Sequence, residues 1–150
     1  MTRLTRFLLF AFLFLSGCAA EQPSPPSVPQ APEPAARAPA PSESMAVAGL
    51  MQSARSDTEA GRLGSAAATL ERALRIEPHN PHLWQELARV RLKQGEYGQA
   101  ESVAARSNAW AGSDNGLRAE NWRLIAQARE ARGDSSGAQT ALETAQRLGR

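Results

Sequence analysis

The most informative part of the sequence is residues 81–100, which read PHLWQELARVRLKQGEYGQA. Asn80 and Pro81 fit the N-cap and the first position of a helix, because the Asn side chain accepts backbone hydrogen bonds and a proline needs no partner there. Gly95 can adopt the positive φ with which many helices end. The segment therefore predicts one helix over residues 81–94 and a second helix directly after it.

The pattern of this segment recurs along the chain. Trp84 has a counterpart in Trp122, 38 residues later, and a weaker counterpart in Leu50, 34 residues earlier. Large residues at these places fill the space between helices, and small residues a few positions further on let two backbones approach closely. The predicted core of the repeats consists of Leu50, Leu70, Trp84, Leu87, Ala88, Ala100, Trp122, Ile125, Ala126 and Ala138.

A helical repeat of this length resembles the tetratricopeptide repeat. The resemblance covers residues 45–150 and implies an all-α fold, a helical-hairpin solenoid of about three tetratricopeptide-like repeats. We expect the repeat units at about residues 47–80, 81–114 and 119–150. The six helices are predicted over residues 45–60, 65–77, 81–94, 97–110, 118–132 and 136–148.

The N-terminus has the layout of a secretory signal. Two arginines, Arg3 and Arg6, precede an apolar run at residues 7–15, which is shorter than the roughly 20 residues needed to span a membrane. The sequence Leu-Ser-Gly-Cys that ends at Cys18 resembles a bacterial lipobox, in which the cysteine receives lipid and becomes the new N-terminus. We predict a lipoprotein signal peptide over residues 1–17 and lipidation of Cys18. The alternative is an ordinary signal peptide with a chance cysteine.

The stretch after the cysteine is rich in proline. Eight of the ten prolines lie between residues 23 and 41; they block helix and sheet, and the segment has no large side chains to bury. We predict a disordered Pro/Ala-rich linker over residues 18–44 that acts as a passive spacer. In lipoproteins the residue after the cysteine influences sorting, and Ala19 resembles that of outer-membrane cargo. We therefore expect a lipid anchor in the outer membrane, on its periplasmic face.

Charge and composition argue against several classes of protein. The chain has 17 basic and 15 acidic residues, and two of the basic ones lie in the signal, so the sequence lacks the clustered basic surplus of a nucleic-acid-binding protein. Alanine, the best helix former, is the most frequent residue, which argues against a β-rich fold. The single cysteine excludes an internal disulfide and a multi-thiolate metal site.

The sequence also lacks a convincing catalytic or metal site. His79 and His82 suggest a metal pair, but a helix break lies between them and no third ligand is near. Acidic residues such as Glu86 are expected to pair with arginines at helical spacing, here Arg89, on a solvated face. We expect no metal, no cofactor and no enzymatic activity, and a monomeric domain.

The remaining candidate site is the concave surface of the solenoid, which the first helix of each pair lines. The residues that helical spacing places there are Met51, Arg55, Thr58, His82, Gln85, Arg89, Lys93, Arg123, Gln127 and Glu130. Four of them, Arg55, Arg89, Lys93 and Arg123, are basic, which favours an acidic or carboxylate-bearing peptide as ligand. The alternatives are ordinary solubilising charges and a contact surface at the C-terminal edge, where no polar capping helix is evident.

The order of lipidated cysteine, Pro-rich tether and small tetratricopeptide domain resembles the LpoP-type outer-membrane activators of class A penicillin-binding proteins. The resemblance implies a periplasmic protein-binding module that contacts and activates or regulates a peptidoglycan synthase, with the membrane reached through the lipid. The alternative is a pilotin-like or general assembly scaffold for an envelope complex. Such proteins usually carry more repeats and little Pro-rich tether.

Overall fold

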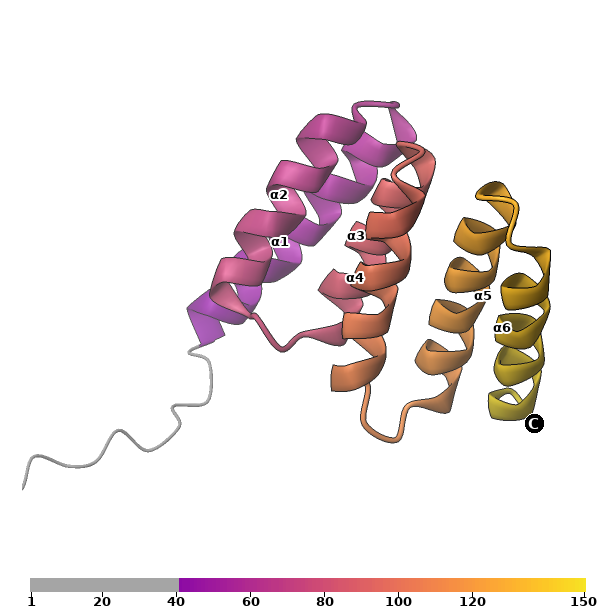
Figure 1. Cartoon of the computed structure of the whole chain (residues 1–150). Coiled ribbons are helices and arrows are strands. Elements are labelled where there is room, and N and C mark those ends of the chain that lie inside the picture. Colours follow the sequence, from indigo (N-terminus) through magenta and orange to yellow (C-terminus); the bar gives the residue numbers. More distant parts are fainter. Residues whose placement is uncertain (1–40) are drawn as a thin grey trace, which may run out of the picture. The chain divides into compact units, whose positions relative to one another are not determined.

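The computed structural model describes residues 41–150, with side chains from Ser44 onward. The predicted signal peptide, Cys18 and residues 19–40 of the predicted linker lie outside the described residues. The described part forms six helices and contains no strand (Figure 1). The helices are α1 (Pro41–Glu59), α2 (Leu63–Ile76), α3 (Pro81–Lys93), α4 (Tyr97–Trp110), α5 (Asn115–Ala131) and α6 (Ser135–Leu148).

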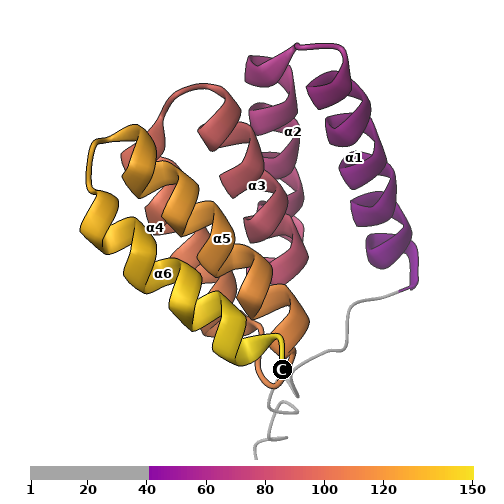
Figure 2. The same ribbon diagram turned by 90° about the vertical axis from the view of Figure 1, so that its right-hand side faces the viewer.

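The helices form three antiparallel hairpins, α1–α2, α3–α4 and α5–α6, that stand side by side (Figures 1 and 2). Each helix packs against the next one along the chain, and α3 also contacts α5. This arrangement confirms the predicted all-α solenoid of three helical pairs.

None of the described helices has both the length and the apolar character needed to cross a membrane.

Each hairpin turns at a glycine in the left-handed region of backbone space. Gly61, Gly95 and Gly133 have φ angles of 74°, 77° and 81°. In all three turns the residue after the glycine donates its backbone N–H to a carbonyl five residues earlier, over 2.8 or 2.9 Å. The three turns therefore share one geometry, in which hydrogen bonds satisfy carbonyls at the end of the first helix.

Two helices begin three or more residues earlier than the sequence predicts. α1 starts at Pro41, so residues 41–44, which were assigned to the linker, form its first turn. A proline is tolerated there because the first backbone N–H groups of a helix have no partner within the helix. α5 starts at Asn115 because the Asp114 side chain accepts a hydrogen bond from the backbone N–H of Leu117 at 2.9 Å and caps the helix.

Two clusters of buried side chains hold the hairpins together. One joins α1, α2 and α3, and the other joins α3, α4, α5 and α6. The predicted core residues that the structure buries are Leu70, Leu87, Ala88, Ala100, Ile125, Ala126 and Ala138.

Three predicted core residues, Leu50, Trp84 and Trp122, are only partly buried. In α3 the large residues that are fully buried are Val90 and Leu83, the neighbour of Trp84. A helix turns about 100° per residue, so a line of buried residues through Leu83 and Val90 leaves the indole at the edge of the core. Trp84 and Trp122 therefore pack against the edges of the two buried clusters and do not fill their centres.

A buried polar network, which the sequence analysis did not predict, links three helices. Asn121 on α5 is fully buried, and its Nδ2 donates to Ser107 Oγ at 2.7 Å and to Asn108 Oδ1 at 3.0 Å, both on α4. Ser107 Oγ in turn donates to the carbonyl oxygen of Pro81 at the start of α3, at 2.8 Å. These bonds satisfy Asn121 Nδ2 and the Ser107 hydroxyl and align the second repeat with the third, whereas Asn121 Oδ1 and Asn108 Nδ2 are buried without a partner within residues 44–150.

Candidate interaction groove

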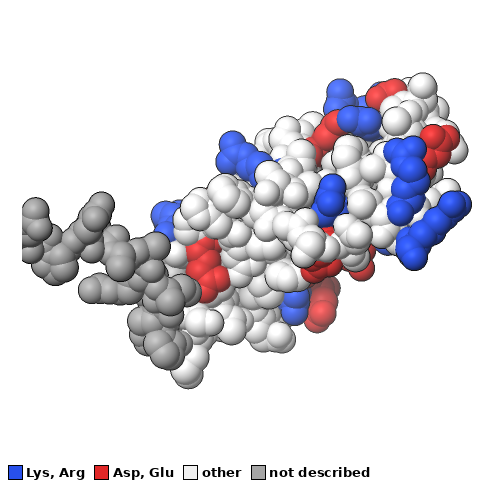
Figure 3. Space-filling view, turned by 90° about the horizontal axis from the view of Figure 1, so that it is seen from below, with Lys and Arg blue, Asp and Glu red and all other residues white. Residues whose placement is uncertain are grey.

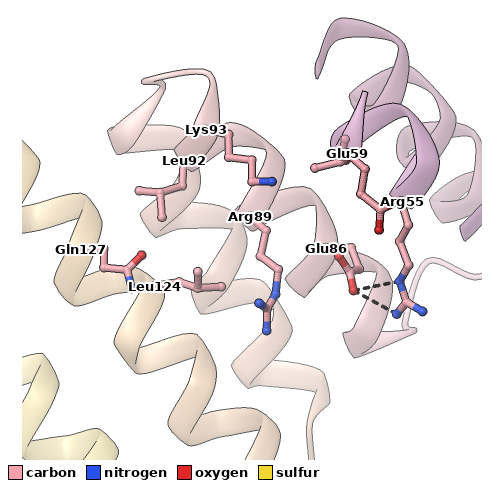
Figure 4. A pocket seen from close by; sticks show the side chains of 9 residues that line it. Arg55, Glu59, Glu86, Arg89, Leu92, Lys93, Leu124 and Gln127 are labelled. Carbon is pink, nitrogen blue, oxygen red and sulfur yellow. Dashed lines mark hydrogen bonds and ion pairs between the residues drawn. The ribbon is translucent and has the colours of Figure 1, made fainter. Parts of the chain in front are cut away.

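A groove of about 440 Å³ runs along the first helices of the three hairpins (Figure 4). Its lining residues are Arg55, Thr58 and Glu59 from α1, Glu86, Arg89, Leu92 and Lys93 from α3, and Leu124 and Gln127 from α5. We call it the first-helix groove, because α2, α4 and α6 contribute no lining residue. It lies on the helices on which the sequence placed the candidate site.

The structure separates the predicted groove residues into two halves. Those that line the groove are Arg55, Thr58, Arg89, Lys93 and Gln127, and those that do not are Met51, His82, Gln85, Arg123 and Glu130. Gln85 is almost completely buried, and its Nε2 donates to Glu120 at 3.4 Å. Arg123 is exposed, and its guanidinium lies close to Gly149 at the end of α6.

Four lining residues were missed by the sequence analysis: Glu59, Glu86, Leu92 and Leu124. The prediction took from each helix only the residues that lie directly above one another at a spacing of three or four. A groove between helices is lined by residues from two neighbouring rows of a helix, as Leu92 and Lys93 of α3 show. Leu92 packs against the buried cluster that contains Leu124. Together these two leucines form an apolar patch between α3 and α5 (Figure 4).

Ion pairs between repeats neutralise much of the charge in the groove. Arg55 on α1 binds Glu86 on α3 at 2.9 Å, and Arg89 on α3 binds Glu120 on α5 at 2.5 Å. The expected pairing of Glu86 with Arg89 inside α3 is therefore wrong. On the face shown in Figure 3, several acidic side chains of the described residues lie next to basic ones. Uncharged surface separates these groups from one another.

The predicted cluster of four basic groups needs the same correction. Arg123 lies outside the groove and the other two arginines, Arg55 and Arg89, are paired, so Lys93 is the lining cation that has no acidic partner within residues 44–150. Nε of Arg89 is buried and makes no hydrogen bond there. Glu59, which also lines the groove, has no basic partner within residues 44–150 either. The groove thus offers one unpaired ammonium group and one unpaired carboxylate beside an apolar patch, which is a weaker preference for acidic ligands than the sequence suggested.

The histidines and a titrating carboxylate of the described residues lie outside the first-helix groove. No group of three or more His, Cys, Asp and Glu side chains among them is placed to hold a metal ion. His79 stacks on Trp110, with the ring centroids 4.0 Å apart, and His82 is exposed at the start of α3. The pKa of Asp57 is lowered, first by a hydrogen bond from Ser65 and then by Arg62, but this carboxylate does not line the groove.

At the C-terminal edge α6 exposes mainly polar side chains, such as Gln139, Glu143 and Gln146. Leu142 is the large apolar residue exposed on this helix, at 40%. The last helix therefore covers the end of the solenoid with a polar surface of its own, as repeat proteins require at their ends.

Comparisons with known proteins agree with this architecture. Residues 57–118 match the family model described as tetratricopeptide repeat. The globular C-terminal domain of P. aeruginosa LpoP is 46% identical, with a TM-score of 0.66, over 67% of this chain and 95% of that chain. The chain belongs to the LpoP family. No curated protein sequence matches it.

A second solved structure is similar in fold alone. The N-terminal domain of stress-induced protein-1 (STI-1) from C. elegans has a TM-score of 0.63 and 12% identity, over 74% of this chain and 100% of that chain. Tetratricopeptide and LpoP-like folds are scaffolds for protein–protein interaction. The first-helix groove of this LpoP-family chain is accordingly a candidate site for a protein ligand.

Proposed function

We propose that this LpoP-family chain is a lipid-anchored protein on the periplasmic face of the outer membrane, and that its repeats bind and activate a peptidoglycan synthase of the class A penicillin-binding protein type. The observation that carries the proposal is the 46% identity to the LpoP domain over 95% of that domain. Lipidation of Cys18 supplies the anchor. The domain acts as a monomer, without metal or cofactor, through contacts with its protein partner.

The first-helix groove supports binding of an extended segment of the synthase. An apolar side chain of the ligand packs on Leu92 and Leu124, and a neighbouring carboxylate reaches the ammonium group of Lys93. The paired arginines keep the walls of the groove in place without adding an unbalanced positive charge. This division of roles makes Lys93 the charged group whose change affects binding most.

The length of the segment that precedes the domain supports the same role. Residues 19–40 separate the predicted lipid attachment site from the first residue of α1. At ~3.1 Å per residue, these 22 residues extend to at most about 70 Å. A protein anchored in one membrane needs a reach of this order to touch a synthase anchored in the opposite membrane.

Stimulation of glycan polymerisation by a purified class A penicillin-binding protein from the same bacterium tests the proposal. We expect the full chain to stimulate the synthase and Lys93→Glu to weaken binding about tenfold, since reversing a charge at a contact replaces attraction by repulsion. The matched control is Arg72→Glu on α2, an exposed residue outside the groove. Absence of stimulation by the parent protein overturns the activator role, and unchanged binding of Lys93→Glu overturns the role of the groove.

Deletion of residues 23–40 distinguishes the activator from a pilotin-like assembly scaffold. An activator that bridges two membranes loses its function in cells after the deletion, while the shortened protein still stimulates the synthase in solution. A scaffold that works beside the outer membrane keeps its function in cells. Retained function in cells would therefore favour the scaffold.

A further inference from the structure

A second groove lies on the other side of α3. One part, of about 450 Å³, is lined by residues of α2, α3 and α4, and an adjoining part of about 410 Å³ extends over α4. The two parts share Trp84, Gln99 and Val103, and we call the whole the Trp84 groove.

The Trp84 groove and the first-helix groove use opposite faces of α3. Residues 86, 89 and 93 line the first-helix groove, whereas residues 84, 87 and 91 line the Trp84 groove. At about 100° per residue, the two sets point roughly half a turn apart. A ligand of one groove therefore leaves the other groove open.

The floor of the Trp84 groove is apolar and held in place. Leu74 and Leu87 are buried beneath it, and Val103 is partly buried beside them. The indole of Trp84 is fixed by its Nε1–H, which donates to the carbonyl oxygen of Pro78 at 2.8 Å. A rigid aromatic ring beside aliphatic side chains is the kind of surface that dominates the binding energy of protein interfaces.

The charges around this floor are not balanced. Arg91 is satisfied, because its guanidinium binds Glu71 at 2.6 Å and Glu96 at 2.8 Å. Arg75, which lines the first part of the groove, and Arg106, which lines the second, form no ion pair within residues 44–150. Both are exposed, so two uncompensated positive charges lie on either side of the shared centre.

Arg106 is also held in position. Its guanidinium carbon lies 5.2 Å from the centroid of the Trp84 ring, within the range of a cation–π interaction. A guanidinium held in this way keeps its N–H donors available for a carboxylate, which it can bind with two parallel hydrogen bonds. Less side-chain entropy is then lost when a ligand binds.

We propose that the Trp84 groove binds an extended acidic segment of a partner protein. An apolar side chain of the segment packs on Trp84, Leu74 and Leu87, and acidic residues on either side of it pair with Arg75 and Arg106. The charge complementarity excludes basic segments, and the apolar floor distinguishes this ligand from a simple polyanion. The site is independent of the synthase-binding role of the first-helix groove.

Fluorescence anisotropy with the full chain in detergent and a labelled peptide, Glu-Asp-Leu-Leu-Asp-Glu, tests this site directly. We expect saturable binding that weakens about tenfold in Arg75→Gln/Arg106→Gln, since each lost charged contact reduces the binding free energy. The matched control is Arg72→Gln/Arg147→Gln, which changes the net charge equally at exposed positions outside both grooves. It should bind like the parent protein.

Two further measurements separate this proposal from its alternatives. A peptide with serine in place of both leucines should bind about tenfold more weakly, because it has no side chain for the floor. The Arg75→Gln/Arg106→Gln pair is also measured in a Lys93→Gln background, where binding of the peptide by the first-helix groove is weakened, and it should again reduce binding about tenfold. Equal binding of the serine peptide, unchanged binding in Arg75→Gln/Arg106→Gln, or no binding of the leucine peptide would each overturn the proposal, whatever the outcome of the synthase assay.

Discussion

Arg55 on α1 and Glu86 on α3 join the first two repeats across the first-helix groove. Nε and Nη2 of the arginine donate to one carboxylate oxygen, Oε1, at 3.2 and 2.9 Å (Figure 4). Arg89 and Glu120 make the corresponding link between α3 and α5. Both pairs span 31 residues of sequence. The same ion pair is therefore made between successive repeats, and not between residues three or four positions apart in one helix.

A double-mutant cycle measures what the first link contributes. In the pair, 49% of the Arg55 side chain and 22% of the Glu86 side chain are exposed. We expect Arg55→Ala and Glu86→Ala to show a coupling free energy of about 0.2–1 kcal/mol in urea unfolding, because solvent screens exposed pairs. A coupling above about 2 kcal/mol would show that the pair holds the repeats together far more strongly than an exposed ion pair should.

The buried network around Asn121 should matter more for stability. Asn121→Ala removes both donors of Nδ2 and leaves Ser107 and Asn108 without this partner inside the protein. We expect the free energy of unfolding to fall by about 1–3 kcal/mol, the cost of leaving buried polar groups unsatisfied. Asn108→Ala, at a half-buried position, is the control and should cost less. Equal losses in the two variants would contradict the assigned importance of the buried amide.

Two glycines should respond in opposite ways to replacement by alanine. Gly95→Ala places a side chain at φ +77°, and we expect it to lower the free energy of unfolding by about 1–2 kcal/mol. Gly49 lies inside α1, and a Cβ there would meet no atom within 4 Å. Gly49→Ala should raise the free energy of unfolding by about 0.5–1 kcal/mol, because alanine loses less backbone entropy on folding. Thermal or urea unfolding of both variants checks the two signs.

The stability of the first hairpin should depend on pH through Asp57. Hydrogen bonds from Ser65 Oγ and the Arg62 guanidinium lower the pKa of this carboxyl below its ordinary value of 3.8. A lowered pKa in the folded state stabilises the protein above pH 3.8, and this contribution disappears as the pH falls through the folded-state pKa. Asp57→Asn should therefore be less stable than the parent at pH 7, with the difference shrinking below pH 3.8. A difference that stays constant down to pH 2 would contradict this cause.

Cys18→Ala should release the protein from the membrane without affecting its fold. The predicted lipid attachment site lies outside α1 to α6, so we expect unchanged helical circular dichroism and an unchanged unfolding midpoint. Fractionation of cells should find the variant outside the outer-membrane fraction. Its continued presence in that fraction would contradict lipidation at this cysteine.

Sequence signals were sufficient for the helices and their pairing into hairpins, because these depend on neighbouring residues. Asn80 accepts hydrogen bonds from the backbone N–H groups of His82 and Leu83, at 3.0 and 3.4 Å, as its place before Pro81 predicted. Gly95 turns the chain with a positive φ, also as predicted. The recurrence of Trp84-like positions predicted three stacked units.

Only the tertiary structure decided which side chains share a groove. The position of Leu92 beside Leu124, and the pairing of Glu86 with Arg55 in place of Arg89, depend on how neighbouring hairpins pack against each other. That packing is set jointly by many side chains of α2 on α3, of α4 on α5 and of α3 on α5. Helical spacing places a residue on one face of its own helix, but it contains no information about the helix that this face meets.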